Sequence, residues 1–353
     1  MPWLSFFTAA IITLVLTLAA LRFFPLVGLM DNPKKYGHDR APIPYFGGLV
    51  IFTAFLLLTL TFVPLTKEVL ALLAGSTLLV TVSFLDDRYS LPALLRLAVQ
   101  AIAALILIAG GIGISSISNP LGGVIDLMMI DWTIMIGSAE YHIDLLADGL
   151  ALIWIVTLIN AVNWMDGIPG LSSGVSGLSA LVILVLAIRP DFHYFDQSTV
   201  ITLASIIAGS AIMFTFFNAS PPKILLGDTG SMLLGFIIGA LAIFSGAKIA
   251  TAALVLGVPL IDALLVISTR LLAGRAPWRG GEWDADRTPV HLHHRLLAAG
   301  YSERQVLGII LGTSAIFGSV ALFVSGAGVK LAIFGIIAIG MLTLILRLKK
   351  QMA

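Results

Sequence analysis

Long apolar blocks separated by short polar segments constrain the fold of this chain more than any other feature of its sequence. A helix needs about 20 apolar residues to cross the roughly 30 Å hydrocarbon core of a bilayer. Alternation at the period of a β-strand is absent from these blocks, which favours a helical bundle over an outer-membrane barrel. Eleven blocks are candidate membrane spans, some of them short: about 3–24, 46–63, 68–85, 93–114, 149–162, 171–188, 199–217, 231–248, 250–272, 306–324 and 329–346.

Composition excludes a soluble or disordered chain. Hydrophobic residues make up 59% of the 353 residues and charged residues only 11%, whereas soluble domains contain about 45–50% apolar and about 25% charged residues. The chain has no cysteine, which excludes disulfides, thiolate metal sites and cysteine nucleophiles. The first block lacks a basic flank and a cleavage site of small residues, so we expect a retained helix there rather than a signal peptide. Because no repeat is visible, residues 1–353 are expected to form one polytopic domain.

Basic residues predict the orientation of the bundle. If the N-terminus lies outside and eleven helices alternate, sixteen of the twenty Lys and Arg residues fall on the inside, as the positive-inside rule requires. The inner loops are then 25–45, 86–92, 163–170, 218–230 and 273–305. The long outer segment 115–148 carries turn residues between short strand-like runs, which predicts a small external β-hairpin. Nearly all of the unusual polar clusters fall on the inner face.

Asp86 and Asp87 form the first of these clusters, directly after an apolar block. Two adjacent carboxylates at the C-terminal end of a helix repel each other and also oppose the helix dipole. Such a pair is tolerated where a cation or a cationic complex neutralises it. The alternative is a solvated loop in which Arg88 is the partner.

Asn160, Asn163 and Asp166 form the second cluster, and their spacing places them on one face of a helix end. Two amides and a carboxylate on one stripe of a membrane helix are costly unless they bind something. Oxygen ligands of this kind suit Mg²⁺ or Mn²⁺. The alternative is a seam of hydrogen bonds between two helices.

The third cluster is the Gly-rich turn from Lys223 to Ser231, which contains Gly227, Asp228 and Gly230. Its backbone N–H groups and the helix that follows favour an anion, and Asp228 can hold a metal ion that bridges to it. The ending of a Walker A loop is missing. The alternative is a simple helix N-cap by Asp228 or Thr229.

Three histidines, His291, His293 and His294, precede Arg295 in the fourth cluster. A zinc site is disfavoured because neither a fourth ligand nor a glutamate base has the required spacing. Histidine and arginine donors that contact a diphosphate or a sugar are the favoured interpretation. Outside these clusters, Asp262 lies within an apolar block after Pro259, where a functional role and a structural hydrogen bond are equally plausible.

Together the clusters resemble one family, the polyprenyl-phosphate N-acetylhexosamine-1-phosphate transferases of bacterial cell-envelope synthesis (glycosyltransferase family 4). The resemblance runs from Asp31 to about Arg304. It rests on Asp86-Asp87, the Asn-x-x-Asn-x-x-Asp-Gly run, the Gly-Asp-x-Gly-Ser turn and the His-x-His-His run. A looser motif before them contains Lys35, His38, Pro44, Gly47 and Gly48. The His-x-His-His form is similar to the branch that uses UDP-N-acetylglucosamine or a related UDP-sugar.

The resemblance implies an all-α polytopic membrane enzyme that transfers a sugar phosphate at the inner face of the plasma membrane. A polyprenyl phosphate attacks the β-phosphorus of a UDP-N-acetylhexosamine, UMP leaves, and a lipid diphosphate sugar forms. It implies that Asn163 and Asp228 hold Mg²⁺ (or Mn²⁺). The implied catalytic residues are Asp86, Asp87, Asp166, His291 and His293. The implied substrate-binding residues are Lys35, His38, Asn160, Gly167, Leu225, Gly230, His294 and Arg295.

Two residues depart from the family pattern, both where the nucleobase is read. Pro169 stands where the family usually has Asp or Asn, and Leu225 where it tends to have an aromatic residue. Transferase chemistry is therefore a firmer expectation than the identity of the nucleotide. The alternatives are a phospho-MurNAc-pentapeptide transferase, a secondary transporter of phosphorylated sugars, and a membrane scaffold or receptor. No nucleic-acid partner is expected, and a homodimer is possible.

Overall fold

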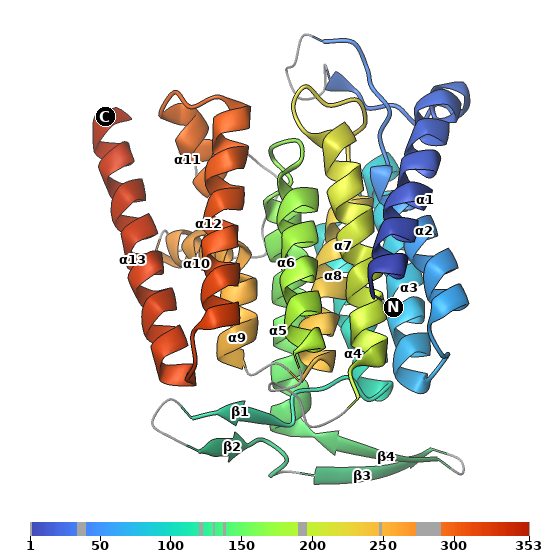
Figure 1. Ribbon diagram of the computed structural model, residues 1–353, viewed down its shortest axis with the longest axis vertical. Helices are drawn as coiled ribbons and strands as arrows, with labels where there is room; N and C mark the ends of the chain where they lie inside the picture. The colour runs from blue at the N-terminus through green and yellow to red at the C-terminus, as the bar shows by residue number, and fades with distance from the viewer. Residues whose placement is uncertain are drawn as a thin grey trace.

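Helices that run side by side build most of the molecule (Figure 1). The computed structural model describes residues 2–33, 40–119, 123–129, 131–136, 139–189, 196–246, 249–272 and 291–352. The long helices are α1 (Pro2–Phe23), α2 (Gly47–Phe62), α3 (Lys67–Tyr89), α4 (Ala93–Ala109), α5 (Leu145–Trp164), α6 (Leu171–Ile188), α7 (Ser198–Asn218), α8 (Asp228–Phe244), α12 (Glu303–Phe323) and α13 (Ala327–Met352). Shorter helices are η1 (Pro25–Val27), α9 (Ile249–Val255), α10 (Gly257–Leu272) and α11 (Leu292–Ala298).

The lengths and apolar composition of these helices confirm a helical, multi-pass membrane protein. In the part of the chain that the structure describes, six helices are long and apolar enough to cross a bilayer: α1, α3, α5, α6, α7 and α12. Helices α2, α4 and α8 and the first half of α13 are apolar but somewhat shorter. The eighth helix forms the centre of the bundle, because nearly all of its residues are buried and α2, α3, α5, α6 and α7 all contact it.

The apolar block 250–272 differs from the prediction, because it is two helices rather than one. Helix α9 ends at Val255 and α10 begins at Gly257. Pro259 explains the break, since a continuous helix would need its missing N–H to donate to the carbonyl of Val255. That carbonyl accepts a hydrogen bond from Ser179 Oγ of α6 at 3.1 Å instead. A neighbouring helix thus satisfies the polar group that the break leaves unpaired.

Two small antiparallel hairpins lie at one end of the bundle (Figure 1). In the first, β1 (Ser116–Ser118) pairs with β2 (Val124–Asp126). In the second, β3 (Asp131–Ile136) pairs with β4 (Ala139–Asp144). Segment 115–148 therefore forms two different hairpins, where the sequence predicted one.

The polar loops gather at the end of the bundle opposite the hairpins (Figure 1). The segments that precede α2, join α5 to α6 and join α7 to α8 lie there, together with α11. The chain starts toward the hairpin end, and α13 ends at the polar-loop end. This arrangement agrees with a bundle whose two termini lie on opposite sides of the membrane, with the predicted site on the side of the C-terminus.

Candidate active site

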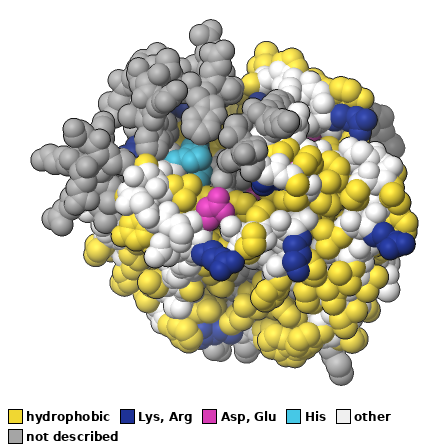
Figure 2. All heavy atoms as spheres, turned by 90° about the horizontal axis from the view of Figure 1, so that it is seen from above, with side chains coloured by type: hydrophobic (Ala, Val, Ile, Leu, Met, Phe, Trp, Pro, Cys, Tyr) yellow, Lys and Arg dark blue, Asp and Glu magenta, His cyan; other side chains and the backbone are white. Residues whose placement is uncertain are grey.

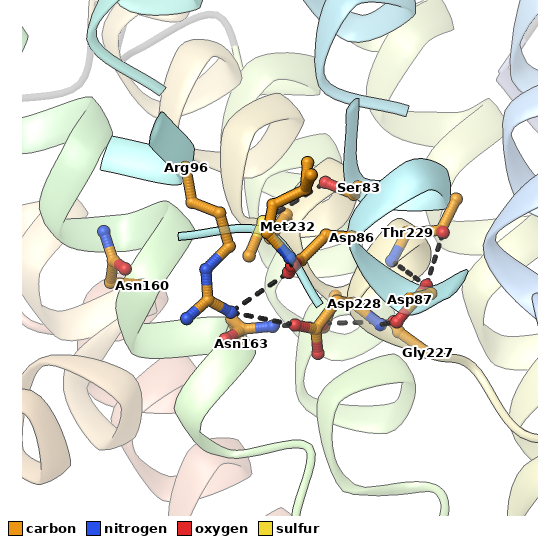
Figure 3. A network of polar contacts seen from close by, with 12 residues as sticks. Ser83, Asp86, Asp87, Arg96, Asn160, Asn163, Gly227, Asp228, Thr229 and Met232 are labelled. Carbon is orange, nitrogen blue, oxygen red and sulfur yellow. Dashed lines mark hydrogen bonds and ion pairs between the residues drawn. The ribbon is translucent and has the colours of Figure 1, made fainter. Parts of the chain in front are cut away.

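Four carboxylates from three segments of the chain come together at the polar-loop end. Asp86 and Asp87 lie in the last turn of α3, Asp166 follows α5, and Asp228 opens α8. Figure 3 shows Asp86, Asp87 and Asp228 as neighbours, and both Asp87 and Asp228 lie close enough to Asp166 to repel it electrostatically. The sequence clusters therefore form one site, because α3 and α5 end where α8 begins.

Asp87 caps the N-terminus of α8, a helix about 140 residues further along the chain. Its Oδ1 accepts hydrogen bonds from the backbone N–H of Asp228 at 3.1 Å and from the Tyr45 hydroxyl at 3.0 Å. Its Oδ2 accepts from the backbone N–H of Thr229 at 3.0 Å and from the Thr229 hydroxyl at 2.6 Å. A negative charge at this position also stabilises the helix dipole.

Gly227 explains why the cap comes from another helix. It occupies the N-cap position of α8 with φ of 75°, and it has no side chain to offer as a cap. A Cβ at this position would lie 3.1 Å from Asp87 Oδ2 and 3.1 Å from the Tyr45 ring. The simple N-cap by Asp228 or Thr229 is therefore wrong. Burial, and then the charges of Asp87 and Asp228, raise the pKa of Tyr45 well above its usual value, so its hydroxyl remains a donor.

Asp86 turns away from Asp87 and binds Arg96 of α4. Its Oδ2 lies 3.0 Å from Arg96 Nη1, and its Oδ1 accepts from the Leu91 N–H at 2.7 Å. Arg96 Nη1 is also 3.6 Å from Asp228 Oδ2, so a single guanidinium joins two of the carboxylates (Figure 3). The solvated-loop alternative fails for Asp86, which is only 6% exposed and has Arg96 as its partner.

Asn163 and Asp228 are placed as a pair that could hold a divalent cation. The side chains point toward each other in Figure 3, where the Asn163 amide nitrogen faces and donates to the Asp228 carboxylate. The same Nδ2 donates to Ser231 Oγ at 3.0 Å. Rotation of the amide by half a turn would bring its oxygen to a cation held by Asp228. The Asp228 side chain is 32% exposed. Burial, then the charge of Asp228 and then that of Asp87, raise the pKa of Asp166 well above its usual value.

The charge balance of the site suits a cation. Arg96 is the guanidinium that faces Asp86 and Asp228, and four carboxylates share the region. Within the described ranges, no three His, Asp or Glu side chains converge so as to hold a metal ion by themselves. Mg²⁺ does not need such a cage, since it commonly binds one or two carboxylates together with substrate phosphates and water. The donor set at Asn163 and Asp228 therefore fits Mg²⁺.

Asn160 lies one turn below Asn163 and pairs with another helix. Its Nδ2 donates to Gln100 Oε1 of α4 at 2.6 Å, and Gln100 Nε2 is 3.4 Å from Asn160 Oδ1. This reciprocal amide pair matches the helix–helix seam that the sequence left as an alternative. The pair fixes the distance between α4, which carries Arg96, and α5, which carries Asn163. The substrate contact of Asn160 stays a prediction.

We expect Asn160→Ala and Gln100→Ala both to lower turnover and thermal stability, because each removes one partner of the amide pair at a cost of about 1–3 kcal/mol. The loss should be smaller in Gln100→Ala, since Asn160 Nδ2 still donates to the Val156 carbonyl at 2.8 Å. In a double-mutant cycle the two losses should be strongly non-additive, as for residues in direct contact. Turnover and melting temperature of the two single variants and the double variant measure this. A donor KM that rises in Asn160→Ala but not in Gln100→Ala would instead make Asn160 a substrate contact.

His291 is held by Asp262 of α10, which the sequence left unassigned. Its Nδ1 lies 2.8 Å from Asp262 Oδ2, and its ring is 6.2 Å from the Trp164 ring at the end of α5. The Arg270 guanidinium lies 5.7 Å from the centre of that Trp164 ring. The histidine segment thus packs against the end of the helix that carries Asn163.

His293 points into the protein, where it is 1% exposed. Among the described residues its Nε2 has no hydrogen-bond partner, and it lies over Gly167, where an added Cβ would come within 2.3 Å of that nitrogen. Burial, and then the neighbouring His294, lower the pKa of His293 to about 3. A neutral ring in this position braces the 163–170 loop, and its predicted catalytic contact remains untested. Burial also lowers the pKa values of His294 and Arg295.

Gly230 and Leu225 lie where the start of α2 meets the start of α8. The Gly47 and Gly48 N–H groups donate to the carbonyls of residues 225 and 226 at 2.9 and 3.0 Å. A Cβ on Gly48 would lie 2.2 Å from the Gly230 nitrogen. Close packing of the two backbones thus explains why positions 48 and 230 are glycines. Their predicted substrate contacts, and that of Leu225, remain predictions.

Lys35 and His38 lie outside the described residues. The sequence analysis missed Tyr45, Arg96 and Gln100, each a polar residue beside or within an apolar block. It also missed Asn218, which accepts from the Gly170 N–H at 2.8 Å and donates to the Ile224 carbonyl at 2.9 Å. Asn218 thereby ties the loop after α5 to the loop before α8. The available signal in the sequence was an asparagine directly after the apolar block 199–217.

Figure 2 shows the polar-loop end of the bundle from outside. Histidine and acidic side chains lie side by side near its centre, with Lys and Arg side chains spread around them on a largely apolar surface. Among the described residues, Asp87, Asp166 and Asp228 of the carboxylate group and His291 and His294 of the histidine group are partly exposed; the side chains of Asp228 and His291 are 32% and 16% exposed. The carboxylate and histidine clusters therefore open onto the same face.

Comparison with known proteins gives a consistent set of relatives. The sequence profile of glycosyl transferase family 4 matches residues 69–246. The chain is 27% identical over 338 residues to the probable undecaprenyl-phosphate N-acetylglucosaminyl 1-phosphate transferase of Bacillus subtilis, covering 94% of this chain and 87% of the relative. It is 30% identical over 344 residues to the decaprenyl-phosphate N-acetylglucosaminephosphotransferase of Mycolicibacterium smegmatis, covering 86% and 77%. It is 27% identical over 307 residues to the undecaprenyl-phosphate alpha-N-acetylglucosaminyl 1-phosphate transferase of Escherichia coli O157:H7, covering 83% and 76%.

Proposed function

The chain belongs to glycosyl transferase family 4, and from this premise we propose that it is a multi-pass plasma-membrane enzyme that transfers N-acetylglucosamine 1-phosphate from a UDP-sugar to a polyprenyl phosphate. The observation that carries the proposal is the joining of Asp86, Asp87, Asn163 and Asp228 at the polar-loop end of the bundle. The names of the relatives favour N-acetylglucosamine over a MurNAc-pentapeptide donor. A secondary transporter would place its binding site near the middle of the bilayer, whereas this cluster lies at a helix end.

The proposed reaction joins the phosphate of the lipid to the sugar phosphate of the donor and releases UMP. An oxygen of the polyprenyl phosphate forms a bond to the β-phosphorus of the UDP-sugar, the bond from that phosphorus to the bridging oxygen breaks, and UMP leaves with that oxygen. The product is a lipid diphosphate sugar. Because a phosphate monoester has its second pKa near ~6, the acceptor is already largely dianionic, and no base is required to generate the nucleophile.

The main demand on the protein is therefore to position several phosphates and neutralise their charge. A Mg²⁺ ion bound by Asn163 and Asp228 would supply part of that charge neutralisation when present. Arg96 lies between Asp86 and Asp228 and can direct a second positive charge at a phosphate oxygen. Asp87 fixes the backbone of residues 228 and 229 and so sets the direction of the Asp228 carboxylate. Asp86 and Asp87 are therefore proposed to act by positioning.

The protein purified in detergent should release UMP from UDP-N-acetylglucosamine only when a polyprenyl phosphate and Mg²⁺ are both present. A chelator should stop the release, and added Mg²⁺ or Mn²⁺ should restore it. UDP-MurNAc-pentapeptide, tested in parallel, should be a poor donor. The same protein in liposomes should not accumulate labelled UDP-sugar in their lumen. UMP release that does not depend on the lipid, or accumulation without release, would contradict the proposal.

A further inference from the structure

Asp262 is a buried carboxylate that does not belong to the cluster of Asp86, Asp87, Asp166 and Asp228. It lies in α10, three residues after Pro259, and is 2% exposed. A carboxylate within an apolar helix is unfavourable unless it has strong partners. Both of its oxygens have such partners, because Oδ2 lies 2.8 Å from His291 Nδ1 and Oδ1 accepts from the Leu292 N–H at 2.7 Å. Asp262 therefore binds the start of α11 through two atoms of that helix.

These two bonds fix the His291 ring as well as its backbone. His291 is the N-cap residue of α11 and makes no side-chain cap of its own. Because a carboxylate oxygen only accepts, the Nδ1 of His291 carries the proton and donates it. The other ring nitrogen, Nε2, is then the free one, and which nitrogen is free decides how an imidazole can contact a ligand. Within the described part of the chain, the His291 ring is held through Nδ1.

His291 is partly exposed and lies beside the end of the helix that carries Asn163. Its side chain is 16% exposed, and its ring lies beside Trp164, the last residue of α5 and the neighbour of Asn163. The next histidine, His293, is by contrast buried with its ring stacked 5.4 Å from that of His291. His291 is thus the accessible member of that stacked pair, and Asp262 sets its orientation from inside the bundle.

We propose that Asp262 is a positioning residue, which holds His291 so that Nε2 is the nitrogen presented to the diphosphate of the sugar-nucleotide donor. This inference rests on the proposed function. It assigns a purpose to an intramembrane carboxylate that does not itself touch substrate. The competing explanation is that Asp262 only caps α11 through the Leu292 N–H.

Asp262→Asn separates the two explanations. The asparagine oxygen can still accept from the Leu292 N–H, so the cap is kept, but its NH₂ group then faces His291 Nδ1 as a donor. His291 must take the opposite tautomer or turn its ring. We expect unchanged melting temperature and unchanged KM for the lipid acceptor. We expect kcat/KM for UDP-N-acetylglucosamine to fall about 10- to 100-fold, comparable to loss of the partner that orients a metal-ligating histidine.

Three further variants complete the test. His291→Gln should lower kcat/KM to a similar extent, and adding it to Asp262→Asn should cause little further loss, because both act through one nitrogen. Ser268→Ala is the matched control on α10, since its hydroxyl donates to the Leu265 carbonyl of its own helix at 3.1 Å, and it should behave as the native protein. Native kcat/KM in Asp262→Asn, or losses that simply multiply, would overturn the proposal in favour of a structural cap.

The tautomer can also be read without catalysis. In protein labelled with ¹⁵N-histidine, the His291 signals, assigned by their loss in His291→Gln, should show a protonated Nδ1 in the native protein and a changed pattern in Asp262→Asn. If the native protein shows this signature but releases no UMP, the proposed function fails while the positioning by Asp262 stands. If the signature is absent, the positioning fails whatever the activity.

Discussion

Replacing Asp228 with alanine is expected to abolish sugar-phosphate transfer while the protein still folds and inserts into the membrane. The Asp228 carboxylate faces Asn163 and Arg96 at the start of α8 and is partly exposed, so its removal leaves the fold intact but takes away the charged ligand proposed for Mg²⁺. Removal of one preorganised electrostatic group typically costs about 10²–10³-fold in turnover. Asp228→Asn should lose nearly as much, since the amide keeps the shape but not the charge.

UMP release across a Mg²⁺ titration measures this loss, and metal binding provides a readout that does not depend on activity. The electron paramagnetic resonance signal of added Mn²⁺ should show a bound fraction with the native protein that is lost in both Asp228 variants. Asp196→Asn is a suitable control, because Asp196 also accepts hydrogen bonds at a helix start, from Ser198, but belongs to the segment before α7 at the hairpin end. Unchanged Mn²⁺ binding in Asp228→Ala would disprove the metal assignment.

Asp87→Asn is expected to lower turnover by at least about 10²-fold, equivalent to about 2.7 kcal/mol, and also to destabilise the start of α8. Asp87 uses both carboxylate oxygens to accept four hydrogen bonds, from the backbone and hydroxyl of Thr229, the Asp228 N–H and the Tyr45 hydroxyl. An asparagine has one acceptor oxygen, so its NH₂ group must face one of the two donor pairs. Asp228 would then lose its fixed direction.

The loss in Asp87→Asn should therefore differ in kind from the loss in Asp228→Ala. Hydrogen exchange at residues 228 and 229 should become faster in Asp87→Asn and stay nearly unchanged in Asp228→Ala. Tyr45→Phe, which removes one of the four donors, should give a smaller effect of about 0.5–1.5 kcal/mol. Native turnover in Asp87→Asn, together with native exchange, would return Asp87 to the solvated-loop interpretation.

Much of the architecture follows from the sequence because lipid imposes a simple rule on it. Apolar blocks of spanning length become helices, and polar clusters collect at helix ends. The broken crossing at α9 and α10 was the exception, although Pro259 carried the signal. A run of apolar residues indicates where the chain lies in the membrane. The break, however, is stabilised by another helix, because the Ser179 hydroxyl donates to the Val255 carbonyl that Pro259 leaves without its helical partner.

The site was predictable as a set of residues but not as a set of contacts. Asp86 and Asp87 read as one acidic pair, yet neighbours on a helix point about 100° apart. In the structure they serve different partners, Arg96 and the start of α8. No local pattern links position 87 to position 228, or position 262 to position 291. Such pairings are settled by how the helices pack, which the spacing of residues along the chain does not contain.

The cap that Asp87 supplies to α8 also bears on how this chain can vary over evolution. The N-terminus of a helix is usually capped by the residue that directly precedes it, so a lost cap can be restored by one local substitution. Here Gly227 has no room for a capping side chain, because Asp87 and Tyr45 fill the space beside it. A substitution at any of these three positions therefore disturbs the contacts that the other two residues make at the start of α8. In related sequences Tyr45, Asp87 and Gly227 should therefore be kept together or replaced together. A relative with a capping side chain at position 227 should have residues other than tyrosine and aspartate at positions 45 and 87.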